Sequence, residues 1–598
     1  MRESAQTRKM MERAAVVALI AMAPVVWDPW GVQAFLHPKL LVLGIGLLVG
    51  GLALAAGSID LPGSRAIRWA LAVFCVAAIV SIISADAPWV ALLGSAPRQL
   101  GLTVWIGHVL IALVGFNLFR EEPSSGLSVI GVSLLSGLAV VSVFALLEGL
   151  GLSPFDFNQT FGGRVQSVLG NPAALGAYCV LGLPVAAAIT AEASLSTRRR
   201  VVAAIVVLSS LLALILTGSR GAWMGAGVAA VAVVILSTLR RKTSNRFRVA
   251  AGLAVVLVIV ATLPSGRWQT LGEAGEGRAA LWAVGLEAAI ANPVVGAGPE
   301  GFAFEFGEHV DESFVVEYTR EQVYDRAHNG VIDAAVAFGI PGLGAYLVLM
   351  GGVLVCIYRG LRSEDWTIIG IAAGLLAYLV QQQTYFQVAV VDAVFWLMAG
   401  LLAGRVATLE RNTLVGSALR PAAIALGCWL AVYAVLGIAA DHYDKRALAT
   451  RDAYVAIDAL ETAASLRPVD NVHYLQAAAI GRQVPDASVV QRTLDLIRGG
   501  RKWSPTDELL ILAEVNLLNQ SFRLSGDYGA LADGDSLLLE LLARDPTNGE
   551  AYLRLGTSAY YRGDVTAAED YWLRAATLLP NSNAPRSNLE ILYSEFGE

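Results

Sequence analysis

The chain has 598 residues, of which 56% are hydrophobic and only 15% are charged. This balance exceeds what the core of one soluble domain requires and is typical of a polytopic membrane protein. The formal net charge of −6 excludes no class of partner, because acidic and basic residues lie in different parts of the chain. Residues 12–440 are a succession of apolar segments, whereas residues 441–598 are rich in charged residues with helical periodicity. We therefore predict a membrane domain at 1–440 and a second domain at 441–598.

The apolar segments begin directly after a basic N-terminus that ends at Arg13. The first of them is followed by many more, so we predict an uncleaved first helix and not a removed signal peptide. A helix needs about 17 to 25 apolar residues to cross the hydrocarbon of a bilayer. About thirteen segments fit this length, the first being short, and they lie at 14–27, 39–57, 67–84, 100–119, 127–147, 171–192, 201–217, 220–238, 248–263, 330–358, 367–384, 386–404 and 421–440.

The connecting segments alternate in charge, which predicts the orientation of the chain in the membrane. The basic segments fall on the side of the basic N-terminus, and they contain Arg65 and Arg68, Arg198 to Arg200, Arg240 to Arg248, Arg359 and Arg362, and Arg405 and Arg411. The positive-inside rule assigns that side to the cytoplasm. The other side then receives the segments 85–99, 149–170 and 381–387, a long polar loop at 264–329, and the C-terminal domain. The protein is expected in the cytoplasmic (inner) membrane with its C-terminal domain outside the cytoplasm.

The C-terminal region carries the spacing of a tetratricopeptide repeat. Small residues, an aromatic residue and a closing proline stand at the expected offsets, at Leu555-Gly556, Gly563, Ala568, Trp572, Ala575 and Pro580. A weaker register runs from Ala456 to Pro468. A lone repeat cannot bury its apolar face, so several units are expected to stack into a short α-solenoid. Its concave face would bind a peptide or partner protein, or the domain would be a structural cap. The predicted fold class is all-α: a bundle of about 12 to 13 membrane helices followed by this domain.

Three short basic segments are predicted to reach the same outer side of the membrane: 217–221, 277–282 and 327–330. They contain Arg220, Arg278 and His328, respectively. A guanidinium beside hydrocarbon is costly without a partner, which makes it a candidate functional residue. Arginine offers the always-charged, two-pronged donor that a diphosphate requires, so the group suggests a site for a phosphorylated lipid.

Each of these residues has a structural alternative. Arg220 stands at the expected start of a helix after a glycine-containing break, where backbone N–H groups also bind phosphate, but it could simply extend to lipid headgroups. Arg278 could form an ion pair with Glu273, Glu276 or Glu287. His328 could be a buried, hydrogen-bonded structural residue.

Six ordered motifs of the chain resemble the O-antigen ligase and polymerase superfamily over roughly residues 30–405. They are Gly170-Asn171-Pro172-Ala173, Thr217 to Ala222, Gly277 to Trp282, Asn292 to Gly298, Ala327-His328-Asn329 and Gly339 to Gly344. The resemblance implies a GT-C-like helical core that transfers a glycan from undecaprenyl diphosphate to an acceptor hydroxyl, without a metal or other cofactor. It implies that His328 is the catalytic residue and that Arg220 and Arg278 hold the diphosphate.

The resemblance leaves the acceptor open. Members of this superfamily include lipid A core ligases, repeat-unit polymerases and protein O-oligosaccharyltransferases, so the acceptor could be a glycan, a lipid or a protein. Asn171, Asn329 and Asp392 are further candidates for the cavity. Asp392 is costly to bury inside a span, and it could either pair with an arginine or line the cavity.

The other residue patterns favour no competing chemistry. His309 lies in the polar loop among acidic residues and ranks second to His328, whereas His108 lies within a span and is expected to form an interior hydrogen bond. Cys75, Cys179, Cys356 and Cys428 have no paired spacing, and no metal-ligand spacing, Walker loop or nucleic-acid motif appears. A transporter or flippase of lipid-linked oligosaccharides would also place cations in the membrane. Here the cations gather at one face, which favours the transferase; a scaffold with a degenerate membrane core is the third alternative.

Overall fold

The computed structural model describes residues 2–54, 59–96, 98–118, 123–155, 161–191, 196–239, 271–319 and 324–596. The predicted span at 248–263 and the basic cluster from Arg240 to Arg248 lie outside these residues. Each of the other predicted spans corresponds to a helix. Seven described helices are long and apolar enough to cross a membrane, and shorter apolar helices accompany them. The chain is therefore an all-α integral membrane protein.

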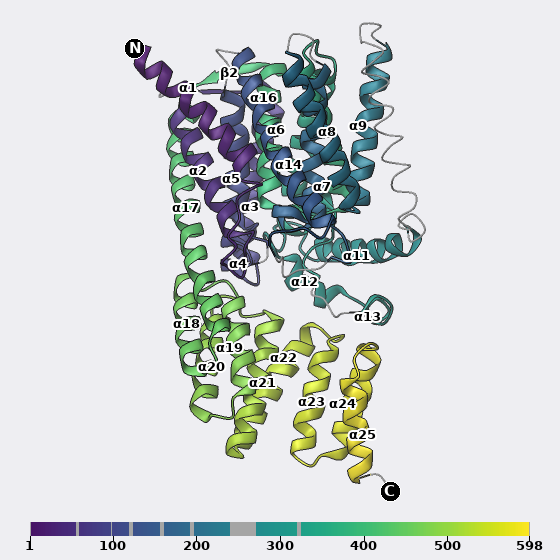
Figure 1. Ribbon diagram of the computed structural model, residues 1–598. Helices are drawn as coiled ribbons and strands as arrows, with labels where there is room; N and C mark the ends of the chain where they lie inside the picture. The colour runs from purple at the N-terminus through teal and green to yellow at the C-terminus, as the bar shows by residue number, and fades with distance from the viewer. Residues whose placement is uncertain are drawn as a thin grey trace.

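The membrane helices form an upright bundle (Figure 1). Their bounds are α1 Arg2–Val16 with a π-helical continuation Val17–Met22, α2 His37–Ala53, α3 Arg65–Ser84, α5 Leu102–Asn117, α6 Pro123–Gly149, α7 Pro172–Ala191, α8 Thr197–Leu216, α9 Arg220–Leu239, α14 Gly330–Leu361, α15 Trp366–Gln381, α16 Ala389–Val406 and α17 Thr413–Ala449. One end of the bundle carries a two-stranded antiparallel sheet of β1 Ile59–Pro62 and β2 Leu409–Asn412. Arg359 donates a hydrogen bond to the carbonyl of Val406 near this end.

Apolar side chains cover the outside of the bundle as well as its inside. On α3, for example, Ile83 is 83% exposed, while Phe74 and Ala78 are buried. A helix that is apolar all round suits a bilayer, because one face packs against neighbouring helices and the other contacts lipid. Small residues allow close packing inside: a Cβ added to Gly374 of α15 would lie 2.3 Å from the carbonyl oxygen of Leu181 in α7. The four cysteines are free thiols; Cys179 and Cys356 are buried, Cys75 is partly buried and Cys428 is exposed.

The interval expected as a long loop, 264–329, is largely helical where it is described. It contains α11 Leu271–Ala291, α12 Phe302–His309 and α13 Glu312–Tyr318, which lie across the end of the bundle away from the small sheet (Figure 1). The short helices α4 Pro88–Leu93, η2 Ser167–Leu169 and η4 Gln382–Thr384 belong to the other segments predicted for this side. An apolar core joins α11, α12 and α13 to the start of α14, which explains why the interval is folded and not loose.

The C-terminal region is a row of helices beyond α11 to α13 (Figure 1). They are α18 Ala453–Leu466, α19 Val472–Gln483, α20 Ala487–Arg501, α21 Glu508–Ser525, α22 Tyr528–Arg544, α23 Gly549–Tyr561, α24 Val565–Leu578 and α25 Ala584–Phe596. Gly556 of α23 packs directly against the indole of Trp572 in α24, at the offsets that predicted the repeat. Helix α17 runs without a break through residue 440, where the domain boundary was expected. The repeat assignment and the boundary stay predictions.

Candidate active site

His328 lies immediately before α14 in a constrained backbone conformation. Its φ is +55°, in the left-handed region that few non-glycine residues adopt. The next residue, Asn329, caps α14 by accepting hydrogen bonds from the N–H groups of Val331 (3.0 Å) and Ile332 (3.2 Å). On the other side, the N–H of Ala327 donates to Asp333 Oδ1 at 2.8 Å. The backbone of His328 is therefore fixed from both sides, as is common for strained residues at functional sites.

The imidazole of His328 packs edge-on against Phe386, with 5.2 Å between the ring centroids. The pKa of His328 is lowered to about 4, mainly by burial; the positive charges of Arg98, Arg278 and Arg326 also lower it, whereas Asp325 raises it. The largest cause is the loss of solvent, which disfavours the charged ring. The neutral ring has a free lone pair and can accept a proton at pH 7.

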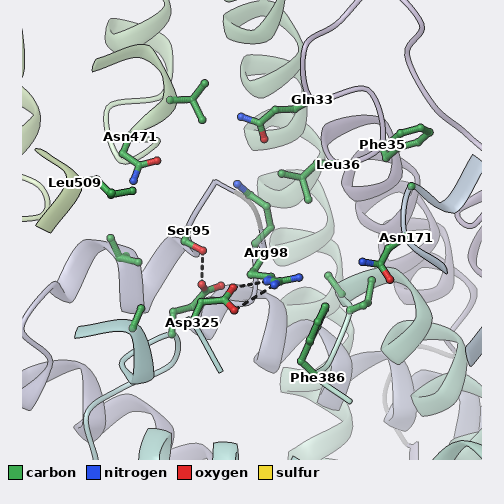
Figure 2. Close-up of a pocket in the computed structure, with 18 of the residues that line it drawn as sticks. Gln33, Phe35, Leu36, Ser95, Arg98, Asn171, Asp325, Phe386, Asn471 and Leu509 are labelled. Carbon is green, nitrogen blue, oxygen red and sulfur yellow. Dashed lines mark hydrogen bonds and ion pairs between the residues drawn. The ribbon is translucent and has the colours of Figure 1, made fainter. Parts of the chain in front are cut away.

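Arg98 is a site residue that the sequence did not single out. Its guanidinium forms an ion pair with Asp325, with Nε 2.5 Å from Oδ2 and Nη2 3.2 Å from Oδ1 (Figure 2). The same guanidinium stacks on Phe386, 3.8 Å from the ring centroid. Arg98 thus holds the two residues that surround His328. Its location in a short polar segment on the predicted outer side was the available signal, but an arginine there is also typical of a headgroup contact.

Arg278 lies on α11, on the face that packs toward His328. Seven residues later, Gly285 lies against Ala327 and Ile332, and residues seven apart share one face of a helix. Burial and the positive charge of Arg220 lower the pKa of Arg278. Among the described residues we find no ion pair for Arg278, so the helix-surface pairing considered as its alternative is not observed there.

Arg220 is the first residue of α9, as the glycine-containing break predicted. The preceding Gly218 has a φ of +58°, and the carbonyl of Thr217 accepts a hydrogen bond from Arg164 Nε at 2.7 Å. Arg220 affects the pKa of Arg278, and Arg278 affects that of His328, so Arg278 lies within electrostatic reach of both other residues. The structure therefore brings together the three basic segments, which are separated by up to 108 positions in the sequence (328 − 220).

A polar segment at residues 381–387 connects the remaining candidates. The side chain of Gln381 donates to the carbonyl of Ala173, and Tyr385 Oη donates to Asn171 Oδ1 at 2.8 Å. Asn329 Nδ2 donates to the carbonyl of Gln383 at 3.3 Å. The start of α9 contacts this segment too, since a Cβ on Gly221 would meet Thr384 Oγ1. The sequence signal was a run of polar residues between two apolar helices.

Asp392 is enclosed by polar side chains of α15 and η4. It is buried in the first turn of α16 and accepts hydrogen bonds from Tyr378 Oη (2.5 Å) and Gln382 Nε2 (3.3 Å). Within the described part of the chain it has no ion pair with an arginine. Its contact with Gln382 supports the polar segment from behind, which is a positioning role.

The loop motifs 292–298 and 339–344 are structural. Helix α14 is kinked at Gly339, whose φ is +63°. The loop fills this kink: Ala297 N–H donates to Val336 O at 2.8 Å, and Ile340 N–H donates to Pro293 O at 2.7 Å. The two motifs thus join the end of α11 to α14, which fixes Arg278 relative to His328.

The other histidines are engaged elsewhere. His108 makes the expected interior hydrogen bond, to the carbonyl of Ala389 at 2.8 Å. The Nε2 atom of His309, the second candidate, lies 3.3 Å from Glu305 Oε2. His309, Glu305 and Glu308 are close enough to bind a cation together. Glu308, however, already pairs with Arg544, and Glu305 accepts a hydrogen bond from Asn292, so this cluster is satisfied by protein groups.

A chamber of about 1140 Å³ opens beside the site. We call it the interdomain chamber, because the bundle forms one wall and the C-terminal helices form the other. Asn171, Arg98, Asp325 and Phe386 line the first wall (Figure 2). Of the three residues expected in the cavity, Asn171 therefore lines the chamber, whereas Asn329 caps α14 and Asp392 is enclosed between helices.

Comparison with known proteins agrees with this arrangement. Residues 203–347 match a family model described as O-Antigen ligase. The matched segment runs from α8 into α14 and contains Arg220, Arg278, His328 and Asn329. No curated protein matches the chain. The match supports glycan transfer of the ligase type, and with the membrane helices it indicates a chain similar to O-antigen ligases over the segment that holds its candidate site.

Proposed function

We propose that the protein transfers a glycan from undecaprenyl diphosphate to an acceptor hydroxyl on the outer face of the cytoplasmic membrane. The observation that carries the proposal is the convergence of a neutral, half-buried histidine with two arginines inside the segment similar to O-antigen ligases. A diphosphate leaving group needs positive charge, and a hydroxyl nucleophile needs a proton acceptor. Arg220 and Arg278 supply the first, and His328 supplies the second.

The reaction is a single displacement. The acceptor hydroxyl gives its proton to the neutral ring of His328 while its oxygen forms a bond to the anomeric carbon. The bond between that carbon and the phosphate oxygen breaks, and undecaprenyl diphosphate leaves with the bonding electrons. Attack from the face opposite the leaving group inverts the anomeric configuration. The two guanidiniums balance the charge that develops on the diphosphate, so the mechanism needs no metal ion.

The location of the site supports the proposed topology. The site and the C-terminal helices lie at the end of the bundle opposite the small sheet, and α8 begins at the sheet end with Arg198 to Arg200 in its first turn (Figure 1). The positive-inside rule then assigns the sheet end to the cytoplasm. The C-terminal helices would face the compartment in which an exported acceptor is available.

Substitutions at the three basic residues test the mechanism in a reconstituted transfer assay with parallel measurement of donor binding. His328→Ala should bind the donor but lose about 10²- to 10⁴-fold in turnover, because a proton acceptor acts mainly on the transition state. Arg220→Lys should also fail, since an ammonium cannot make the two-pronged contact. Arg278→Lys should be milder and mainly weaken donor binding.

His442→Ala is the histidine control, because His442 is about half exposed and pairs with Asp28, and neither of these residues affects the pKa of His328. It should retain wild-type turnover. Wild-type turnover in His328→Ala would eliminate the proposed base and make His309 the next candidate. Full activity of Arg220→Lys would show that this position supplies charge alone. Loss of wild-type activity in excess chelator, with recovery on adding magnesium, would contradict the metal-independent mechanism.

A further inference from the structure

The interdomain chamber has a second wall that the proposed reaction does not explain. This wall comes from α19, α21 and α22 and the segments next to them, and it includes Asn471, Leu509 and Glu540 (Figure 2 shows the first two). The chamber volume, about 1140 Å³, exceeds the roughly 300 to 1,000 Å³ of most small-molecule pockets. A chamber of this size next to the site is large enough for an extended ligand.

The wall is held in place by polar contacts between the two parts of the chain, one buried and one exposed. Arg467, which is only 1% exposed, donates to Gln99 Oε1 and to the carbonyl of Tyr433. Arg544 pairs with Asp86 and Glu308 across the same junction. Since these contacts come from both the bundle and the C-terminal helices, the chamber is a built feature of the fold.

Carboxylates dominate the charge of the C-terminal wall. Its acidic residues are Asp507, Glu508, Glu540 and Asp545, and its cations are Lys445 and Arg544. Arg544 is already engaged in ion pairs, as is Arg98 on the opposite wall. An anionic ligand would be repelled by this wall. Most of these carboxylates already accept hydrogen bonds from neighbouring protein groups, and Glu540 is exposed. Burying the exposed carboxylate of Glu540 against a lipid chain would be costly.

The bundle wall complements these groups with aromatic rings. Trp27 and Phe155 meet edge to face at 4.2 Å, and Tyr385 lies 4.0 Å from Phe386. The C–H faces of sugar rings pack on aromatic side chains, while their hydroxyls donate hydrogen bonds to carboxylates and amides. Rings on one wall and carboxylates on the other are therefore suited to an uncharged, hydroxyl-rich chain.

We infer that the interdomain chamber binds an uncharged glycan, and that the C-terminal helices select it against anionic glycans. The inference rests on the proposed function, because the chamber adjoins the candidate site through Phe386 and Asp325. The bound glycan belongs either to the lipid-linked donor or to the acceptor. In either case the arginines hold the diphosphate, and the glycan lies between the bundle wall and the C-terminal wall.

Two leucines of α21 provide a matched test of the chamber. Leu509 lines it and Leu524 does not, yet both are 38% exposed in the same helix. Binding to the purified full-length protein is measured with maltotetraose as the neutral probe and tetragalacturonate as the anionic probe. Leu509→Trp should weaken maltotetraose binding at least about fivefold by filling space, and Leu524→Trp should leave it unchanged. Absence of maltotetraose binding to the wild type, or equal binding by both variants, would overturn the inference.

A charge reversal tests the selectivity. Glu540 lines the chamber, whereas Asp533 is exposed on the same helix, α22, outside it. The wild type should prefer maltotetraose to tetragalacturonate, and Glu540→Lys should reduce this preference by about threefold or more while Asp533→Lys does not. Equal affinity of the wild type for the two probes would refute the selective role of the wall.

Transfer assays then identify the source of the glycan. If the donor glycan occupies the chamber, Leu509→Trp should impair transfer from donors with several sugars more than transfer from donors with one. If the acceptor glycan occupies it, the loss of transfer should instead increase with the length of the acceptor. Equal impairment at every length would count against the inference. If the wild type used no diphosphate-linked donor at all, the proposed function would fail. The binding measurements would still test whether the chamber binds a glycan.

Discussion

At the scale of single residues, His328 combines a strained backbone with a ring that packs against other side chains of the site. The ring is surrounded by an aromatic residue and a paired arginine. Burial keeps the ring neutral, so the proton acceptor is present without an adjacent base to generate it. The cost is that a histidine with a low pKa is a weak base, which makes precise orientation toward the acceptor hydroxyl more important.

The pH dependence of the reaction follows from the lowered pKa of His328. Its pKa falls from 6.5 to about 4, so the proton-accepting form of the free enzyme predominates above about pH 4 and is lost only as the pH falls through that value. We expect kcat/KM to show no loss centred at pH 6.5. A bound diphosphate adds negative charge and should raise the pKa, so kcat should fall at a higher pH than kcat/KM.

Arg278→Gln tests this explanation. It removes a positive neighbour of His328, so it should raise the pKa of His328 and move the acid limb of kcat/KM to higher pH. Arg492→Gln, on the surface of the C-terminal helices, should leave the limb in place. A limb centred at 6.5 in the wild type would contradict a half-buried His328 as the group that limits activity.

Arg98 should act through the residues that it positions. Arg98→Lys keeps a positive charge but loses both the two-pronged contact with Asp325 and the stacking on Phe386. We expect kcat to fall by about tenfold or more with little change in the KM for the donor, because a misplaced base affects turnover more than binding. Arg451→Lys, at an exposed position, is the control. A change confined to KM would instead identify Arg98 as a donor ligand.

At the scale of elements, the site depends on how closely α9 approaches α15. Gly225 of α9 lies against the backbone of α15: an added Cβ would be 2.2 Å from the carbonyl oxygen of Ala377. Gly227, two residues later, has nothing within 4 Å of the same position. The first glycine permits the helix contact that places Arg220 beside the polar segment 381–387, and the second has no such role.

Alanine substitutions at these two glycines should therefore have opposite effects. Gly225→Ala should destabilise the protein by about 1 to 3 kcal/mol through overpacking and should reduce transfer by displacing Arg220. Gly227→Ala should be neutral or slightly stabilising, because alanine favours helix over glycine by up to about 1 kcal/mol. Thermal unfolding in detergent, followed by transfer assays, measures both. Equal melting temperatures for the two variants would show that the contact does not constrain α9.

Helix periodicity and apolar length predicted the elements well, and the reason is physical. A span must satisfy its backbone internally and present apolar side chains, so its sequence carries the signal locally. The start of α9 at Arg220 and the position of His328 before α14 were predictable in the same way. The pairing of Arg98 with Asp325 was not, because 227 positions separate the two residues and neither has a local pattern that names its partner.

At the scale of the whole molecule, the two parts of the chain are joined by buried polar contacts that the sequence did not indicate. In the sequence, no pattern distinguishes Arg467 from other charged residues at helix ends. In the structure it stacks on Tyr433, 3.7 Å from the ring centroid, pairs with Asp470 and contacts Gln99. Such docking depends on complementary surfaces that fold from distant segments, so composition could predict a second domain but could not predict its orientation.

Removal of Arg467 should loosen this junction. Arg467→Ala leaves Asp470 buried without its partner and should cost about 3 to 5 kcal/mol, with faster proteolysis between α17 and α18. Arg492→Ala breaks a pair that is about one-third exposed, with Arg492 at 35%, and should cost less than about 1 kcal/mol. Unfolding curves and limited proteolysis would compare the variants. Similar protease resistance in both would show that the junction is held elsewhere.

The unbroken course of α17 has a consequence for how such a protein can change. Its 37 residues span about 55 Å, which exceeds the roughly 30 Å of hydrocarbon. One residue inserted between 441 and 449 would turn every downstream helix by about 100° and advance it by about 1.5 Å. Arg467 would then point away from Gln99. The number of residues in this helix therefore fixes the rotation and the height of the C-terminal helices relative to the bundle. Only insertions that preserve both would keep these helices docked.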